Sequence, residues 1–189
     1  MRILCDLDSI VVNLQEAWLG AYNRDYNDNI QTADILEWDT HKFVKPECGE
    51  RLYDYLTQPG FFRNLKPLDG AVDALRELHK DFKITIVTAA PVGTADEKVE
   101  WVGEWLPFLD YKKDVIVCYN KYLIKGDILI DDSPRNILDY RKHHFYSTIC
   151  TIAYPYNKIV EDIVDIYAED YSKSKEAWRH ISEYLVTLL

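Results

Sequence analysis

The chain has 189 residues, 48% of them hydrophobic, which is enough to bury a sizeable core and argues against disorder. It has no apolar stretch of the roughly 20 residues that a membrane span needs, and residues 1–9 lack the features of a signal peptide. The formal net charge of −10 disfavours a polynucleotide partner, because nucleic-acid phosphates would meet a repelling field. Four widely spaced cysteines match no metal-binding motif. We therefore expect a cytoplasmic globular protein that binds neither membranes nor polynucleotides.

Five short apolar runs are predicted to form strands. They cover residues 2–7, 82–90, 114–119, 127–132 and 147–154. Their hydrophobicity is continuous rather than alternating, which is typical of strands that are covered on both faces of a parallel sheet.

Helical patterns lie between and after these strands. Asp69 is a candidate N-cap for a helix over residues 70–80, and residues 94–97 have the form of a capping box that opens a second helix. Residues 174–189 repeat apolar side chains at helical spacing. Strands that alternate with helices predict an α/β fold with a Rossmann-like, doubly wound parallel sheet.

The stretch between the first and second strands is unusually long. Residues 14–69 contain no strong strand and several helical or turn-rich pieces, so we expect a small helical cap inserted into a core formed by residues 1–13 and 70–189. The insertion leaves the core at the carboxyl end of a strand, where ligands of open α/β sheets bind. That place suits a lid over a ligand.

Polar residues gather at the predicted carboxyl ends of the strands. They are Asp6 and Asp8 after the first strand, Thr88 at the end of the second, Lys121 after the third, and Asp131 and Asp132 at the end of the fourth. Crowded carboxylates repel one another unless they cap helices, meet water or hold a cation. Mg²⁺ with a bound phosphate is the simplest common solution, and a nearby carboxylate could act as nucleophile. The pattern predicts phosphoryl transfer.

Each of these features also has an ordinary structural explanation. A D-x-D pair is a weak signal, a threonine in a strand is common, and a lysine after a strand is usually solvated. The sequence "DDSPRN" is a normal helix start, with Asp132 or Ser133 as cap and Pro134 in the first turn. The order of the features at successive strand ends is what makes the combination specific.

This order resembles the motif series of the haloacid dehalogenase superfamily of phosphatases. The matching pieces are "DLDSI", "IVTAA", "NK" and "LIDD". Residues 58–78, 97–102 and 120–136 resemble segments of the 5'(3')-deoxyribonucleotidases, and residues 37–56 resemble the cap of their bacterial branch. The resemblance extends from residue 3 to about residue 160. It implies a Mg²⁺-dependent phosphatase that acts on nucleoside, and particularly deoxyribonucleoside, 5'- or 3'-monophosphates.

The resemblance also implies roles for the aspartates. Asp6 would be the nucleophile that forms an aspartyl-phosphate, and Asp8 would protonate the leaving oxygen and then activate water. Asp6, the backbone carbonyl of Asp8 and Asp132 would hold Mg²⁺, while Asp131 would hold a metal-bound water. Ser9 stands where the family usually has glycine.

Phosphate binding would fall to Thr88 and to a lysine. Lys121 matches the family's motif, Lys98 at the start of the second helix is another candidate, and the sequence leaves open which of the two is the main phosphate ligand.

The resemblance extends to the walls of a nucleoside pocket. Trp38 and Phe62 in the insertion are expected to stack against the base. Leu14, Ala89 and Tyr119 stand where the animal enzymes have an aromatic residue, serine and arginine near the base and sugar. Because hydrogen-bond donors are lost at two of these positions, the preferred base and sugar stay open.

Three other functions are compatible with parts of the pattern. The nearest is a phosphatase of the same superfamily that acts on another small phosphomonoester, such as a sugar phosphate. A phospho-acceptor signalling domain would lack the long insertion and would order its lysine differently, and an inactive binding protein would have no need for all four motifs. Families of this kind include dimers, so a homodimer is also open.

Overall fold

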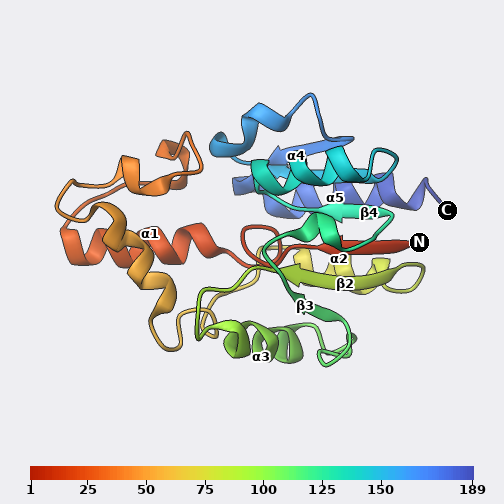
Figure 1. Cartoon of the computed structure of the whole chain (residues 1–189), viewed down its shortest axis with the longest axis horizontal. Coiled ribbons are helices and arrows are strands. Elements are labelled where there is room, and N and C mark those ends of the chain that lie inside the picture. The colour runs from red at the N-terminus through yellow and green to blue at the C-terminus, as the bar shows by residue number, and fades with distance from the viewer.

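The computed structural model describes residues 1–189 and contains one six-stranded sheet in which all paired strands are parallel (Figure 1). The strands are β1 (Arg2–Cys5), β2 (Lys83–Thr88), β3 (Val115–Val117), β4 (Ile128–Ile130), β5 (Thr148–Ala153) and β6 (Ile166–Asp170). Their order across the sheet is β3-β2-β1-β4-β5-β6. The winding direction reverses beside β1, so a ligand crevice is expected at the carboxyl end of this central strand. The predicted doubly wound parallel sheet is confirmed.

Helices cover both faces of the sheet. They are α2 (Ala71–Leu78), α3 (Ala95–Trp105), α4 (Pro134–His143) and α5 (Ser174–Val186), whereas α1 (Leu14–Tyr26) lies beyond the strand ends. The larger of two buried clusters includes Leu75 of α2, Trp101 of α3 and Trp178 of α5, whereas the smaller includes Ile137 and Tyr140 of α4. Each helix is too short or too polar to traverse a bilayer.

The two edge strands differ from what the sequence predicts. The pattern does not predict β6, which carries exposed Glu169 and Asp170 in place of a continuous apolar run. The predicted strand over 114–119 is shortened to β3, so Cys118 follows the strand and is only half-buried. Edge strands are paired on one side only and lie at the rim of the covering layers, so they need fewer apolar residues.

The helix starts show two further differences. Gly70, with φ +82°, occupies the N-cap of α2 in place of Asp69, and a Cβ at this glycine would lie 2.9 Å from the Cα of Lys175. The expected capping box at α3 is also wrong, because Thr94 donates to the carbonyl of Pro91 instead of accepting from the helix. The start of α4 is as predicted, with Ser133 as the cap.

Glu97, the acid of the expected capping box, instead bonds to a loop of the inserted segment. Its carboxylate accepts the backbone N–H groups of Gly60 at 2.6 Å, Phe62 at 3.1 Å and Arg63 at 3.3 Å. These bonds fix residues 60–63, near the end of the inserted segment, against α3, and they hold the ring of Phe62 over Lys98.

The inserted segment lies beyond the carboxyl ends of the strands, whereas both chain termini lie at the opposite end (Figure 1). It contains α1 and 3-10 helices at Thr32–Asp34, Thr40–Phe43 and Gly49–Thr57. Trp18 of α1 donates its indole N–H to the carbonyl of Leu52 at 2.8 Å, which joins α1 to the third 3-10 helix. Residues between β1 and α2 are thus helical in the structure, and their division from the core as a cap stays a prediction.

Replacement of Glu97 by alanine should leave three N–H groups, two of them partly buried, without their acceptor. We expect the free energy of unfolding in urea to fall by about 1–3 kcal/mol. Glu100→Ala is the matched control on the same helix, because it removes an exposed ion pair with Arg63 that should contribute less than about 1 kcal/mol. Equal losses for the two variants would contradict this role of Glu97.

Candidate active site

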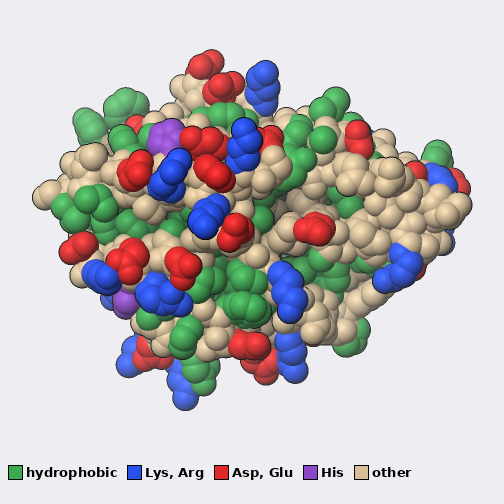
Figure 2. All heavy atoms as spheres, turned by 180° about the vertical axis from the view of Figure 1, so that it is seen from behind, with side chains coloured by type: hydrophobic (Ala, Val, Ile, Leu, Met, Phe, Trp, Pro, Cys, Tyr) green, Lys and Arg blue, Asp and Glu red, His purple; other side chains and the backbone are tan.

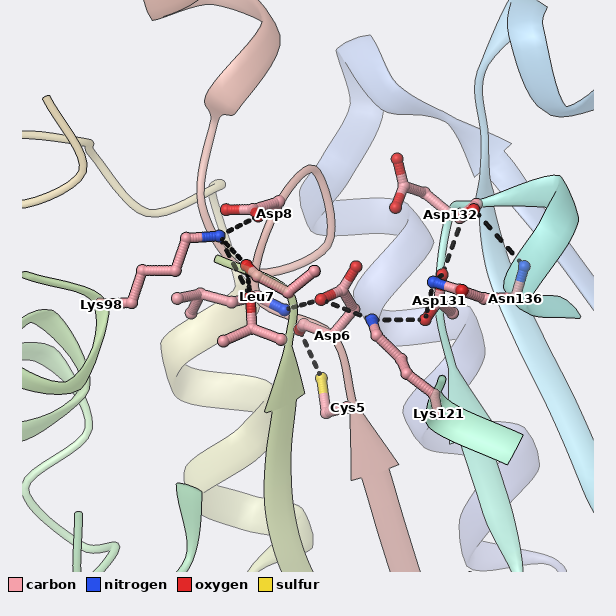
Figure 3. Close-up of polar contacts among 12 residues, drawn as sticks. Cys5, Asp6, Leu7, Asp8, Lys98, Lys121, Asp131, Asp132 and Asn136 are labelled. Atoms are coloured by element: carbon pink, nitrogen blue, oxygen red, sulfur yellow. Dashed lines mark hydrogen bonds and ion pairs between the residues drawn. The ribbon is translucent and has the colours of Figure 1, made fainter. Parts of the chain in front are cut away.

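The loop after β1 presents the carboxylate of Asp6 at the centre of the sheet (Figure 3). The Asp6 N–H donates to the carbonyl of Ile130 at 2.8 Å, which continues the pairing of β1 with β4 past the last residue of the strand. Asp6 Oδ1 accepts the N–H of Leu7 at 2.7 Å. Asp6 is 6% exposed, so its carboxylate is fixed in orientation and nearly dry.

Lys121 lies between two of the aspartates (Figure 3). Its Nζ is 2.7 Å from Asp6 Oδ1 and 2.6 Å from Asp131 Oδ2, and its side chain is 1% exposed. Burial lowers the pKa of Lys121, but Asp131 and Asp6 raise it by more, so the lysine stays charged. Asp131 also accepts the N–H of Ser133 at 2.9 Å and the amide of Asn136 at 3.2 Å. Asp131 therefore holds Lys121 against Asp6.

Lys98 makes a second ion pair on the other side of Asp6 (Figure 3). Its Nζ contacts Asp8 Oδ2, and it lies 3.2 Å from the hydroxyl of Thr88 and 2.6 Å from the carbonyl of Ala89. The ring of Phe62 covers the ammonium, with 4.2 Å between Nζ and the ring centroid. Asp8 Oδ1 is buried and accepts no hydrogen bond. Asp6 and Asp8 are thus each paired with a separate lysine.

The aspartates beside Lys121 form a group that can hold a metal ion. Asp6, Asp131 and Asp132 each offer a carboxylate oxygen within 4.8 Å of the others. Burial, with Asp6 and Asp131 nearby, raises the pKa of Asp132 well above its usual range. A cation would remove this destabilisation, and an oxygen-only donor set fits a hard divalent ion. Both oxygens of Asp131 are already engaged, Oδ1 by Ser133 and Asn136 and Oδ2 by Lys121 and Asn136, whereas Asp6 and Asp132 each bond through one oxygen only, so Asp6 and Asp132 are the better ligands.

A cavity of about 220 Å³ opens above these groups. Asp6, Asp8, Lys98, Lys121 and Asp132 line it, and so do all five residues expected to form the nucleoside pocket: Leu14, Trp38, Phe62, Ala89 and Tyr119. The other two predicted site residues, Thr88 and Asp131, are fully buried beneath the cavity and do not line it. A volume of this order suits a small molecule rather than a polymer.

Tyr156 lines the cavity and is absent from the residues that the sequence suggests. Its hydroxyl donates to Asp132 Oδ2 at 2.6 Å, and Trp38 meets its ring edge-on, with 5.6 Å between centroids. Tyr154 stacks on Tyr156 and donates its hydroxyl to the carbonyl of Ser9 at 2.8 Å. Both tyrosines follow β5, so extending the search for strand-end residues to the fifth strand would have found them.

Ser9 has φ +57°, a left-handed conformation that disfavours side chains with a Cβ. This backbone explains why glycine suits the position, and the serine is accommodated with its N–H donating to the carbonyl of Val12 at 3.0 Å.

The charge distribution fits a small ligand. Figure 2 shows acidic and basic side chains interspersed on one face of the molecule, without a broad basic area of the kind that binds a polynucleotide.

Solved structures identify the fold first. The fold is similar to a haloacid dehalogenase-like hydrolase from Streptococcus pneumoniae, with a TM-score of 0.61 and 11% identity over 100% of this chain and 98% of that one. A haloacid dehalogenase family hydrolase from Deinococcus radiodurans, solved with bound phosphate and sodium, has a TM-score of 0.57 and 14% identity over 91% of this chain and 92% of that one. The chain therefore has the haloacid dehalogenase-like fold.

Sequence comparison then gives the family. The model of the "5' nucleotidase, deoxy (Pyrimidine), cytosolic type C protein" family matches residues 1–179, and the chain belongs to this family of phosphoric monoester hydrolases. A 5'(3')-deoxyribonucleotidase of Clostridium acetobutylicum is 42% identical over 136 residues, or 72% of this chain and 75% of the relative. One from Bacillus subtilis is 33% identical over 138 residues, or 71% and 77%. The resemblance inferred from the motifs is confirmed.

The contact between Tyr156 and Asp132 yields a test of the metal site. Tyr156→Phe keeps the ring but removes the hydroxyl that orients a candidate ligand, so the Mg²⁺ concentration needed for half-maximal thermal stabilisation should rise about 10-fold or more. Tyr154→Phe is the matched control, because its hydroxyl bonds to the Ser9 carbonyl and not to a carboxylate. An unchanged Mg²⁺ requirement in Tyr156→Phe would show that the hydroxyl does not support metal binding.

Proposed function

We propose that the protein is a Mg²⁺-dependent phosphatase that hydrolyses nucleoside monophosphates, chiefly deoxyribonucleotides, through an aspartyl-phosphate. The observation that carries this proposal is the arrangement of Asp6, which is held rigidly beside a buried lysine at the floor of a cavity with aromatic walls. Lys121 and the Leu7 N–H both bond to Oδ1 of Asp6. The other oxygen, Oδ2, is then the atom available to attack phosphorus.

In the first step, Asp6 Oδ2 forms a bond to phosphorus while the bond between phosphorus and the sugar oxygen breaks. The departing oxygen takes a proton from Asp8. Oδ1 is the suitable atom of Asp8, because Oδ2 is engaged by Lys98 whereas Oδ1 has no partner. In the second step, Asp8 takes a proton from water, the water oxygen attacks phosphorus, and inorganic phosphate leaves Asp6.

The two lysines have different roles in this mechanism. Lys121 touches Asp6 and is the better candidate for the lysine that neutralises the phosphoryl group, whereas Lys98 orients Asp8. Asp131 acts by positioning Lys121. Thr88 is too deeply buried to line the cavity, but its hydroxyl contacts Lys98 and helps to fix that side chain.

Mg²⁺ would be held by the carboxylates of Asp6 and Asp132 and by the backbone carbonyl of Asp8, and when bound it would offset the negative charge of the phosphate. The buried cluster of carboxylates supports this role, since it is left with more negative charge than Lys121 can balance.

The substrate class rests on the relatives and on the walls of the cavity. The similar proteins of Clostridium acetobutylicum and Bacillus subtilis are named 5'(3')-deoxyribonucleotidases. Leu14, Trp38 and Phe62 supply flat or apolar surface against which a base can pack. We also propose that residues 14–69 act as a cap, because they contribute these side chains and lie over the carboxyl ends of the strands.

A substrate panel tests this function. Phosphate release should be fastest with 5'- or 3'-deoxyribonucleoside monophosphates, slower with sugar phosphates, and abolished by a chelator and restored by Mg²⁺. If sugar phosphates are cleaved as well as nucleotides, the nucleotidase assignment fails while the phosphatase assignment stands. Full activity in the chelator would contradict the metal role.

Asp6→Asn should reduce turnover by about 10³-fold or more, because an amide cannot act as the nucleophile. Rapid-quench analysis of the wild-type enzyme with radiolabelled phosphate on the substrate should trap phosphate on Asp6, and the variant should trap none. Asp73→Asn, at an exposed position of α2, is the control and should be fully active. Normal turnover by Asp6→Asn would rule out the covalent mechanism.

A further inference from the structure

We propose that Gln15 is the residue that hydrogen-bonds the nucleobase and so sets the base preference of the pocket, an inference that rests on the proposed nucleotidase function. Gln15 is the second residue of α1 and lines the same cavity as Asp6 and Asp8.

The side chain of Gln15 has unused hydrogen-bonding capacity. The residue is only 8% exposed, yet its Oε1 atom is buried and accepts no hydrogen bond. Buried amides are nearly always paired, because they lose their bonds to water without replacement. An unpaired amide in the wall of a ligand cavity is therefore best explained by a partner on the ligand.

Three other polar side chains from the inserted segment that line the cavity are already engaged. Trp18 donates to the carbonyl of Leu52, the hydroxyl of Thr40 lies 3.4 Å from the carbonyl of Trp38, and Tyr53 bonds to a histidine. The carboxylates and lysines at the floor pair mainly with one another. Gln15 is thus a neutral polar side chain of the inserted segment whose Oε1 atom has no hydrogen-bond partner.

The position of Gln15 favours the base over the phosphate as its partner. The charged groups that would hold phosphate come from parts of the chain outside the inserted segment, whereas Gln15 belongs to that segment together with the apolar walls Leu14 and Trp18. A carboxamide carries one acceptor and one donor group and can rotate to exchange them. It therefore complements the adjacent donor and acceptor groups on the edge of a nucleobase.

Hydrogen bonding by Gln15 would give the pocket a selectivity that its apolar walls cannot. Rings pack against Phe62 or Trp38 with little regard to their substituents, whereas a site built to bond a polar edge discriminates strongly against bases that lack it. The hydroxyl of Tyr119 cannot donate to the base, because it already donates its hydrogen to the carbonyl of Ala90 at 2.7 Å.

The test compares wild type with Gln15→Met and Gln15→Leu on five deoxyribonucleoside 5'-monophosphates and on 2-deoxyribose 5-phosphate, which has the same sugar and phosphate but no base. We expect kcat/KM for the best nucleotide to fall about 10- to 100-fold, mainly through KM, and the ratios among bases to flatten. Activity on 2-deoxyribose 5-phosphate should change less than about twofold. Both variants should melt at or above the wild-type temperature, because they remove a buried unpaired amide.

Each other outcome has a distinct meaning. If wild type hydrolyses nucleotides and both variants keep its base ratios and KM values, the role of Gln15 is wrong and the proposed function stands. Equal losses on nucleotides and 2-deoxyribose 5-phosphate would assign Gln15 to the sugar, the phosphate or the fold, and would also overturn the inference. If wild type hydrolyses no nucleotide, the proposed function fails and the role of Gln15 fails with it. Because two variants of different shape are used, failure of one to fold leaves the other to decide.

Discussion

Repulsion among four carboxylates at the carboxyl end of one parallel sheet is the constraint on which the rest of the structure depends. Asp6, Asp8, Asp131 and Asp132 converge there because β1 and β4 are neighbours and both end at the same edge. Two almost fully buried lysines offset part of the charge, and the remainder accounts for the affinity for a divalent cation that we propose. The site is therefore costly to fold and well suited to bind a phosphate with a metal ion.

Neighbouring side chains keep these charges in place. Asp131 fixes Lys121, Phe62 covers Lys98, and Tyr156 bonds to Asp132. Glu97 holds the loop that carries Phe62 against α3, so a surface helix is linked to the pairing of Lys98 with Asp8. Such supports matter for catalysis, because a small displacement of a reacting group is enough to slow the reaction greatly.

Much of the fold and site could be predicted from the sequence because the information is local. Continuous apolar runs identify central strands such as β2, and the acids that follow such runs must lie at the rim. Edge strand β6 and Tyr156 escaped prediction for physical reasons. An edge strand can be polar, and a tyrosine after a strand looks the same whether it packs in the core or bonds to a carboxylate.

The sequence by itself determined which polar groups meet at the sheet edge, since Asp6, Thr88, Lys121 and the Asp131–Asp132 pair end or follow its apolar strand segments. Only the tertiary structure decided how these groups are paired, which of them face the cavity, and that Gln15 stands in its wall without a partner. The reason is that hydrogen-bond partners and burial depend on contacts between residues far apart in the chain, such as Lys98 with Asp8. The hydrophobic pattern of the strands does not indicate those contacts.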